Sequence, residues 1–289
     1  MVETWTLLNL LKSTASYLDG RGIVGGRRDA ELLLGQVLKL DRVGLYLNFE
    51  RPVTVAELDT YRELVRRRAA REPLQYILGE TEFWSLPLRV SPAVLVPRSD
   101  TEVLVEEALQ RLPASGNCLD IGTGSGAIVI ALAHECPAAA FTAIDIDPAA
   151  LAVARDNAER HALGGRITFA EGDLFQLAAG CFDLIVSNPP YIRCGDLAGL
   201  MPEVRDFEPR RALDGGEDGL DAYRALTRQA PARLNFGGWL LVEIGIDQAA
   251  AVRELFTVAG FTDIFMRADY AGIDRVIGGR VGSDRGAEI

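Results

Sequence analysis

The sequence has few of the side chains that most often bind metals or act as nucleophiles. Its 289 residues include only two histidines, His134 and His161, and four cysteines, none of them spaced as C-x-x-C. So few histidines argue against a His-rich metal site and against a Ser–His–Asp triad. We therefore interpret both histidines as structural and the cysteines as reduced thiols, and we expect no bound metal.

Signals for membranes and for export are also missing. No apolar run reaches the roughly 18–20 residues of a membrane-spanning helix. The opening stretch, MVETWTLLNLLKSTASY, lacks the basic start, apolar stretch and small-residue cleavage site of a secretory signal. We expect a cytoplasmic protein with no membrane partner, and a monomer by default.

Positive charge is scarce beyond the first part of the chain. The net charge is −11, but residues 1–80 carry +1 and the remainder carries −12. Because such an acidic region is a poor partner for phosphates, we expect no direct binding of nucleic acid, and a small cationic ligand suits the region better. Arg66, Arg67 and Arg68 form a basic cluster that is either a solvated helix face or a contact for an acidic partner.

Periodicity divides the chain into three parts. Residues 1–73 repeat apolar side chains every three or four positions, which predicts a small helical bundle. Within it, Thr54 followed by Glu57 predicts a capping box at a helix start. Residues 74–98 alternate in polarity and contain glycine and proline, which predicts a β-hairpin linker.

The third part, residues 99–289, alternates helical patterns with short apolar strands. This order is typical of an α/β fold in which helices cover both faces of a parallel sheet. The last two expected strands, 262–268 and 274–280, follow each other without a helix, so one of them should be antiparallel. In such sheets ligands bind at the carboxyl ends of the strands, which is where several polar residues fall.

A glycine-rich loop follows the first strand of this part. The segment LDIGTGSGA, residues 119–127, ends a strand and opens a helix, so its backbone can turn tightly and approach a ligand closely. By itself the pattern also fits a dinucleotide site. The residues expected to contact a ligand here are Asp120, Gly122, Thr123, Gly124, Ser125 and Gly126.

Acidic residues end the next two strands. Asp145, in AIDID, can accept hydrogen bonds from both hydroxyls of a ribose, whether in a nicotinamide cofactor or in S-adenosylmethionine. Asp173, in EGDLF, can accept a hydrogen bond from an adenine amino group while Leu174 packs on the ring. Asp120 would then lie near the positive methionine end of S-adenosylmethionine. Alternatively, Asp147 and Asp173 are helix N-caps.

The fourth strand ends in SNPPYI, residues 187–192. Here the sequence resembles the HemK family, the protein-(glutamine-N5) methyltransferases that modify peptide chain release factors. The resemblance covers nearly the whole chain and runs through EPLQYILGETEFWSLPLRV, LVPRSDTEVLVE, LDIGTGSGAI, IDIDPAALAVARDNA, SNPPYI, FEPRRALDGGEDGLDAYR and GGWLLVEIG.

The resemblance implies a fold, a cofactor and a reaction. The fold would be a Rossmann-like S-adenosylmethionine-dependent methyltransferase domain, with a mixed seven-stranded sheet, preceded by the helical bundle and the hairpin linker. The methyl group would go from S-adenosylmethionine to the side-chain amide nitrogen of the glutamine in the Gly-Gly-Gln motif of release factors, leaving S-adenosylhomocysteine. The bundle would dock the release factor while the sheet domain takes its Gly-Gly-Gln loop.

The NPPY motif suits a planar NH2 group, either a carboxamide or the exocyclic amine of adenine. Such an NH2 group is a weak nucleophile because its lone pair is delocalised, so it must be held and polarised. The side-chain carbonyl of Asn188 can accept one N–H and the backbone carbonyl of Pro189 the other, while Pro190 helps keep this corner out of any strand ladder. Both acceptors favour the positive charge that develops on the nitrogen. Tyr191 offers a flat face to the planar group. We expect Asn188 to border the cofactor as well.

Two other segments are candidates for the border of the site. Arg98 and Thr101 lie in PRSDTE, where the family usually has a proline in place of Ser99. Arg98 could instead form a salt bridge, and Thr101 could be a helix cap. Arg210 and Arg211 belong to a glycine-rich loop that either covers the site as a mobile element or is only surface.

Other functions fit parts of the sequence. An adenine-N6 methyltransferase acting on nucleic acid shares the NPPY motif, but it would need a basic groove or a recognition domain. A nicotinamide dehydrogenase fits the glycine loop and leaves NPPY unexplained. A non-catalytic adapter would use the helical bundle and leave the acidic strand ends without a role.

Overall fold

The structure of the protein is a computed structural model, and it describes residues 5–174, 176 and 180–282. The chain forms two compact units. One contains the chain up to Gly79 and the short segment Met201–Phe207, and the other contains Glu80–Leu200 and the chain from Glu208 onward. None of the helices in the described ranges is long and apolar enough to cross a membrane.

The first unit is built from helices. They are α1 (Leu7–Gly20), α2 (Gly26–Leu38), α3 (Arg42–Leu47), α4 (Val55–Ala69), α5 (Leu74–Leu78) and α9 (Pro202–Phe207). Apolar residues of α1 and α2 share one core with Tyr61 of α4, whose hydroxyl donates to the Ala30 carbonyl at 3.1 Å. The predicted capping box is confirmed, because the Glu57 carboxylate accepts from the Thr54 backbone N–H at 2.9 Å and the Thr54 hydroxyl accepts from the Glu57 backbone N–H at 3.3 Å.

The arginine cluster at the end of α4 pairs with acids of its own unit. Arg66 and Arg67 each form an ion pair with a nearby glutamate. Arg68 is buried and forms ion pairs with Asp29 on α2, at 2.7 Å, and with Glu203 on α9, at 3.0 Å. A solvated face therefore describes only part of the cluster, because Arg68 holds α9 to the helical unit.

The second unit begins with an antiparallel hairpin of β1 (Glu80–Phe83) and β2 (Leu86–Arg89). Its main sheet has seven strands, in the order β5-β4-β3-β6-β7-β9-β8. Their bounds are β3 (Asn117–Ile121), β4 (Ala140–Asp145), β5 (Ile167–Glu171), β6 (Phe182–Ser187), β7 (Leu234–Glu243), β8 (Thr262–Ala268) and β9 (Asp274–Arg280). The strands β3 to β7 pair in parallel, and β9 is antiparallel to both of its neighbours, which confirms the expected mixed sheet.

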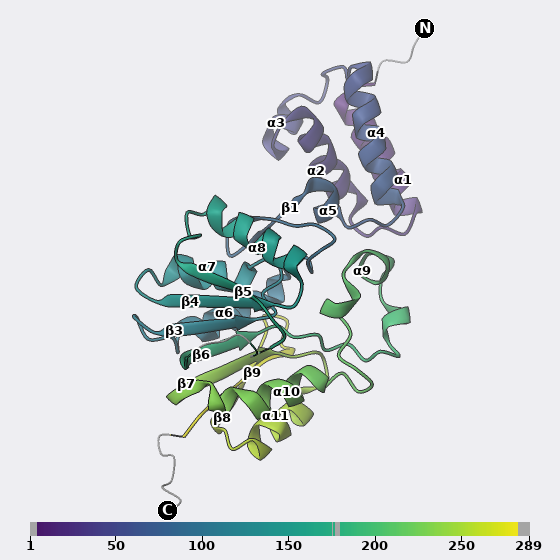
Figure 1. Cartoon of the computed structure of the whole chain (residues 1–289). Helices are drawn as coiled ribbons and strands as arrows, with labels where there is room; N and C mark the ends of the chain where they lie inside the picture. Colours follow the sequence, from purple (N-terminus) through teal and green to yellow (C-terminus); the bar gives the residue numbers. More distant parts are fainter. Residues whose placement is uncertain (1–4, 175, 177–179, 283–289) are drawn as a thin grey trace, which may run out of the picture. The chain divides into compact units, whose positions relative to one another are not determined.

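Helices cover both faces of this sheet, with α6, α7 and α8 on one side and α10 and α11 on the other (Figure 1). Their bounds are α6 (Glu102–Leu109), α7 (Ala127–Glu135), α8 (Pro148–Arg160), α10 (Asp221–Gln229) and α11 (Ala249–Val258). Each face has its own apolar core, because strands buried on both sides present apolar residues in both directions. The sheet is thereby fixed, and its carboxyl edge is a rigid base for a site.

Two segments differ in detail from the sequence expectations. The segment expected as a hairpin linker, 74–98, starts with helix α5, which Gly79 ends in a left-handed conformation before the hairpin begins. The irregular segment after residue 191 contains α9, which shows too short a periodic pattern to be predicted. Its flanks belong to the sheet unit although α9 itself belongs to the helical unit.

Candidate active site

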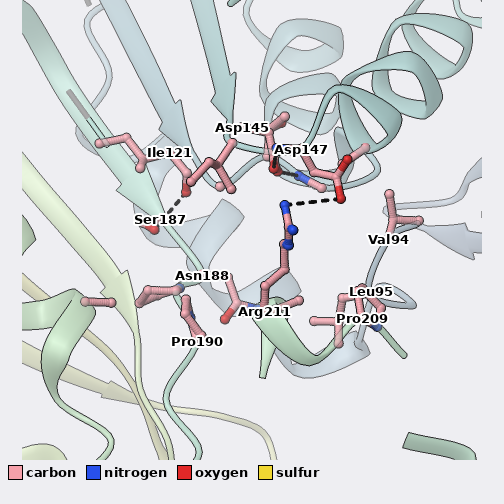
Figure 2. Close-up of a pocket in the computed structure, with 18 of the residues that line it drawn as sticks. Val94, Leu95, Ile121, Asp145, Asp147, Ser187, Asn188, Pro190, Pro209 and Arg211 are labelled. Atoms are coloured by element: carbon pink, nitrogen blue, oxygen red, sulfur yellow. Dashed lines mark hydrogen bonds and ion pairs between the residues drawn. The ribbon is translucent and has the colours of Figure 1, made fainter. Parts of the chain in front are cut away.

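A cavity of about 420 Å³ lies at the carboxyl ends of β3, β4, β5 and β6. The strand order reverses here, since β4 and β5 lie on one side of β3 and β6 lies on the other. This is where open α/β sheets bind ligands, and a volume of roughly 300–1,000 Å³ is usual for such sites. Figure 2 shows Asp145, Asp147, Asn188 and Arg211 around the cavity.

Most of the residues predicted from the sequence line this cavity. They are Gly122, Thr123, Gly124, Ser125, Asp145, Asp173, Leu174, Asn188, Pro189 and Pro190. Three predicted residues are not part of its lining. Asp120 is fully buried beneath the glycine loop, Gly126 is the N-cap of α7, and Tyr191 packs against the core on the α10 side of the sheet.

The glycine loop leaves open space above its backbone. A Cβ atom added at Gly122 or at Gly124 would meet no atom within 4 Å, so a ligand can approach the chain there. The carboxylate of Asp145 supports the loop, because it accepts from the Gly124 N–H at 2.8 Å and from the Asp147 N–H at 2.9 Å. Each carboxylate oxygen keeps a further lone pair, which is the acceptor a ribose hydroxyl needs.

Asp120 forms the floor under the loop. One of its carboxylate oxygens accepts from the Thr123 hydroxyl at 2.7 Å, and the other is buried with no hydrogen-bond partner. Burial raises the pKa of Asp120 to about 7, and the charge of Asp145 adds to this rise, whereas the Thr123 hydroxyl opposes it. An unpartnered buried oxygen that can ionise near neutral pH fits a positively charged ligand group above it.

Asp147 and Asp173 stand further along the same edge. Asp147 is the N-cap of α8 and accepts from the Ala149 N–H at 2.9 Å, so the structural interpretation of this residue is confirmed. Asp173 and Leu174 line the cavity directly after β5. Asp173 is exposed, and its carboxylate is therefore accessible to a ligand.

The corner formed by Asn188, Pro189 and Pro190 borders the same cavity from the end of β6. The hydroxyl of Ser187 donates to the Ile121 carbonyl at 2.8 Å, which ties the corner to β3 (Figure 2). The side-chain nitrogen Nδ2 of Asn188 donates to the Thr101 hydroxyl at 3.2 Å. Because Nδ2 is turned toward the protein, the side-chain oxygen Oδ1 points the other way.

Gln248 holds the far end of this corner, and the sequence patterns did not reveal it. Its side-chain Nε2 donates to the carbonyls of Tyr191, at 3.0 Å, and Gly219, at 3.1 Å, while its Oε1 accepts from the Gly245 N–H at 3.0 Å. A Cβ at Gly219 would lie 2.5 Å from the Tyr191 carbonyl oxygen. Glycine is therefore required here for close packing.

Glu243 is a second residue that the sequence patterns did not reveal. It is the last residue of β7 and 2% exposed, and its Oε2 atom is buried without a hydrogen-bond partner among the described residues. Burial raises the pKa of Glu243 to about 7, against the effect of Thr101, Arg275 and Asn188. A lone acid at the end of an apolar strand, in LLVEIG, was the available signal, and it is the same signal that identified Asp145.

Two arginines reach the cavity from opposite segments. Arg98 lines it and pairs with both oxygens of Glu208, at 2.7 and 2.8 Å, so it both borders the site and forms a salt bridge. Arg211 lines it from the turn after Pro209 and forms an ion pair with Asp147 at 3.5 Å (Figure 2). The loop that carries Arg211 therefore covers part of the site rather than being only surface.

The fold and the cavity together define the class, that of S-adenosylmethionine-dependent methyltransferases. The description "Methyltransferase small domain" belongs to a family model that matches residues 99–199, and "PrmC N-terminal domain" to one that matches residues 9–79. A solved methyltransferase from Pyrococcus furiosus shares the fold, with a TM-score of 0.53 and 21% identity over 68% of this chain and 89% of that one.

Relatives that match along nearly their whole length identify one family within this class of methyltransferases. The release factor glutamine methyltransferase of Geobacter sulfurreducens is 54% identical to this chain, over 97% of this chain and 98% of its own length. The one of Chlorobaculum tepidum is 42% identical, over 94% of this chain and 96% of its own. The chain belongs to the release factor glutamine methyltransferase family.

Proposed function

We propose that the protein transfers a methyl group from S-adenosylmethionine to the side-chain amide nitrogen N5 of the glutamine in the Gly-Gly-Gln motif of peptide chain release factors. One observation carries the proposal. The Asn188–Pro189–Pro190 corner lies in the same cavity as the glycine loop and Asp145, in a chain whose full-length relatives are named for this reaction.

The cofactor side of the cavity is formed by the glycine loop and the acidic strand ends. Asp145 is the acceptor for the ribose hydroxyls, Asp173 for the adenine amino group, and Asp120 the negative group beneath the methionine end. When bound, S-adenosylmethionine supplies a methyl group activated by a positively charged sulfur, and it leaves as S-adenosylhomocysteine.

The substrate side is formed by the corner after β6. The Asn188 Oδ1 atom and the Pro189 carbonyl accept the two N–H groups of the glutamine amide, which aims the nitrogen lone pair at the methyl carbon. With the nitrogen held in this way, the cofactor would supply the methyl carbon and keep the C–S bonding electrons on sulfur, and the nitrogen would lose its extra proton to water. Alignment of this kind can account for up to ~7–11 kcal/mol of a barrier.

The proposal also assigns a role to the helical unit, which would dock the body of the release factor. Burial of Arg68 leaves the more exposed Arg66 as the member of the arginine cluster accessible to such a partner. A cytoplasmic monomer that does not bind nucleic acid directly remains our prediction. The strong negative charge of the chain beyond residue 80 supports it.

One methyl-transfer assay tests the function. The protein is incubated with labelled S-adenosylmethionine and a release factor, the same release factor with its motif changed to Gly-Gly-Ala, or an adenine-containing oligonucleotide. We expect label only on the unchanged release factor. Label on the oligonucleotide alone would refute the proposal and favour the adenine-N6 reaction, which the sequence left as the alternative.

A variant pair tests the role of the corner. Asn188→Ala should lower kcat by about 100- to 1,000-fold, as loss of one positioned group at a developing charge commonly does, while binding of S-adenosylhomocysteine largely survives. The matched control is Asn235→Ala, because Asn235 lies at the start of β7 and donates to Asp183 at 2.7 Å, away from the cavity. Parent turnover in Asn188→Ala would show that the corner does not hold the substrate.

A further inference from the structure

The Asn188 side chain has two chemically opposite ends that occupy nearly the same shape. Oδ1 accepts hydrogen bonds and Nδ2 donates them, and rotation of the carboxamide by half a turn exchanges the two. Only one orientation serves the proposed reaction, because the substrate amide nitrogen is itself a donor. With Nδ2 facing the substrate, the NH2 group of Asn188 would meet the NH2 group of the glutamine, and neither could accept a hydrogen bond from the other. Some neighbouring group must therefore select the orientation.

Thr101 contacts the correct end but cannot select it alone. Its hydroxyl accepts from Asn188 Nδ2 at 3.2 Å. A hydroxyl can also donate, however, so a reversed Asn188 could accept from the same Thr101 oxygen without loss. The selection needs a group that fixes where the hydroxyl proton points.

Glu243 is such a group. It follows Val242, which pairs with Ser187 across β6 and β7, so it lies beside Asn188, and its Oε2 atom is buried without a hydrogen-bond partner among the described residues. Thr101 and Asn188 both lower the pKa of this carboxyl. Burial raises the pKa of Glu243 to about 7, so above that pH its carboxylate is ionised and can only accept. An acceptor at this place attracts the Thr101 proton, which leaves the hydroxyl lone pair for Asn188 Nδ2, and it attracts the NH2 end of Asn188 rather than its oxygen. Both effects favour the orientation that turns Oδ1 toward the cavity.

The surroundings of Glu243 fix its backbone and place a positive charge near its carboxylate. The hydroxyl of Tyr223 donates to the Glu243 backbone carbonyl at 2.9 Å, and Arg275, which pairs with Asp269 at 3.1 Å, is the cation whose charge acts on Glu243. Glu243 is absent from the described residues that line the cavity, whereas Thr101 and Asn188 line it. Glu243 therefore acts on the cavity through these two side chains.

We propose that Glu243 is a positioning residue, which sets the orientation of the Asn188 carboxamide directly and through the Thr101 hydroxyl. This inference rests on the proposed function, because it gives Asn188 Oδ1 the task of binding the substrate amide. It adds to that function a two-residue support that lies outside the NPPY motif, on β7 and in the turn before α6.

The test compares four variants with the parent in the labelled methyl-transfer assay. Glu243→Gln keeps the volume of the side chain but can donate as well as accept, so it supports both orientations of Asn188. Thr101→Val keeps the shape and removes the hydroxyl. The third variant combines these two changes. The control is Glu107→Gln, because Glu107 is a buried acid on α6 that pairs with Arg111 at 2.6 Å and is absent from the cavity lining.

We expect Glu243→Gln to lower kcat by about ten- to a hundred-fold, in line with the loss of a charge-assisted hydrogen bond. KM for the release factor and affinity for S-adenosylhomocysteine should stay within a few-fold of the parent. Because both groups act through one amide, the double variant should be no slower than Glu243→Gln. Glu107→Gln should keep the parent kcat. Parent-like kcat in Glu243→Gln, or losses that multiply in the double variant, would overturn the inference.

A second readout does not depend on activity. Hydrogen exchange of the Asn188 side-chain NH2, followed by NMR in the full-length protein, should be slow in the parent and faster in Glu243→Gln and in Thr101→Val. If the parent methylates no release factor, the proposed function fails while this measurement still decides the role of Glu243. If Glu243→Gln does not fold, Thr101→Val tests the same support, and unchanged exchange there would contradict the proposal.

Discussion

Replacing Asp120 with asparagine should change how the stability of the protein depends on pH. Burial raises the pKa of this carboxyl from 3.8 to about 7 in the folded chain. Because the folded state holds the proton more tightly than the unfolded state, folding is most favourable, with respect to this group, below pH 3.8. That advantage is lost as the pH rises toward 7. The loss is complete once Asp120 is ionised in both states.

The size of the effect follows from the shift. A change of one pKa unit corresponds to 1.36 kcal/mol, so a rise of about three units is worth about 4 kcal/mol in the free energy of unfolding. Between pH 5 and pH 8 the contribution of Asp120 to the free energy of unfolding falls by about 3 kcal/mol, because Asp120 loses its proton in the folded state near pH 7. An asparagine side chain does not titrate, so the variant should lack this fall.

Urea unfolding at several pH values between 5 and 8 measures the effect, followed by the fluorescence of Trp84 and Trp239 in the sheet unit. The quantity of interest is the difference in unfolding free energy between Asp120→Asn and the parent, because Glu243 and all other groups contribute equally to both. We expect this difference to increase by about 3 kcal/mol in favour of the variant from pH 5 to pH 8.

Parallel pH profiles for the two proteins would refute the reasoning, since Asp120 would then titrate alike in the folded and unfolded chains. The same pair also tests the proposed place of Asp120 beneath the methionine end of the cofactor. The variant should bind S-adenosylmethionine more weakly than the parent above pH 7, where Asp120 is ionised. The two should bind it about equally at pH 5, where it is neutral.

Two further substitutions test the supports of the site. Gly126→Ala should lower the free energy of unfolding by about 1–3 kcal/mol, because φ is +82° at this residue and the new Cβ would lie 2.9 Å from the Ile130 side chain. The control is Gly165→Ala, because a Cβ at Gly165 meets open space and φ there is not positive. Thermal melts compare the two variants. Gln248→Glu should lower it by about 2–4 kcal/mol, because an acid has no donor for the two carbonyls that Gln248 binds. The control for Gln248→Glu is Gln110→Glu, at an exposed position, which should leave the urea midpoint unchanged. Equal stability of each variant and its control would show that neither support matters.

The sequence predicted the parts of the site that lie at strand ends. The glycine loop, Asp145 and Asn188 each follow an apolar run directly, so the rule that parallel strands end at one edge was enough to bring them together. A residue that supports the site from outside the cavity could not be found in this way. Gln248 lies in the turn before α11, and only folding shows that its side chain binds the corner after β6.

The helical unit shows the same limit. Its apolar periodicity predicted helices, and Thr54 with Glu57 predicted where one of them begins. The ion pair between Arg68 and Glu203 could not be predicted, because Glu203 is 135 residues away along the chain. Local patterns carry information about local hydrogen bonds and apolar faces, whereas an ion pair of this span depends on the completed fold.

The assignment of α9 to the helical unit has a consequence for any attempt to dissect the protein. The backbone passes from one unit to the other at three places, after Gly79, after Leu200 and after Phe207. A fragment that starts at residue 80 would retain α9 but lose Arg68 and Arg71, the ion-pair partners of Glu203. Residues 201–207 are thus held to the first 79 residues by ion pairs, and removal of those 79 residues would leave α9 without these partners.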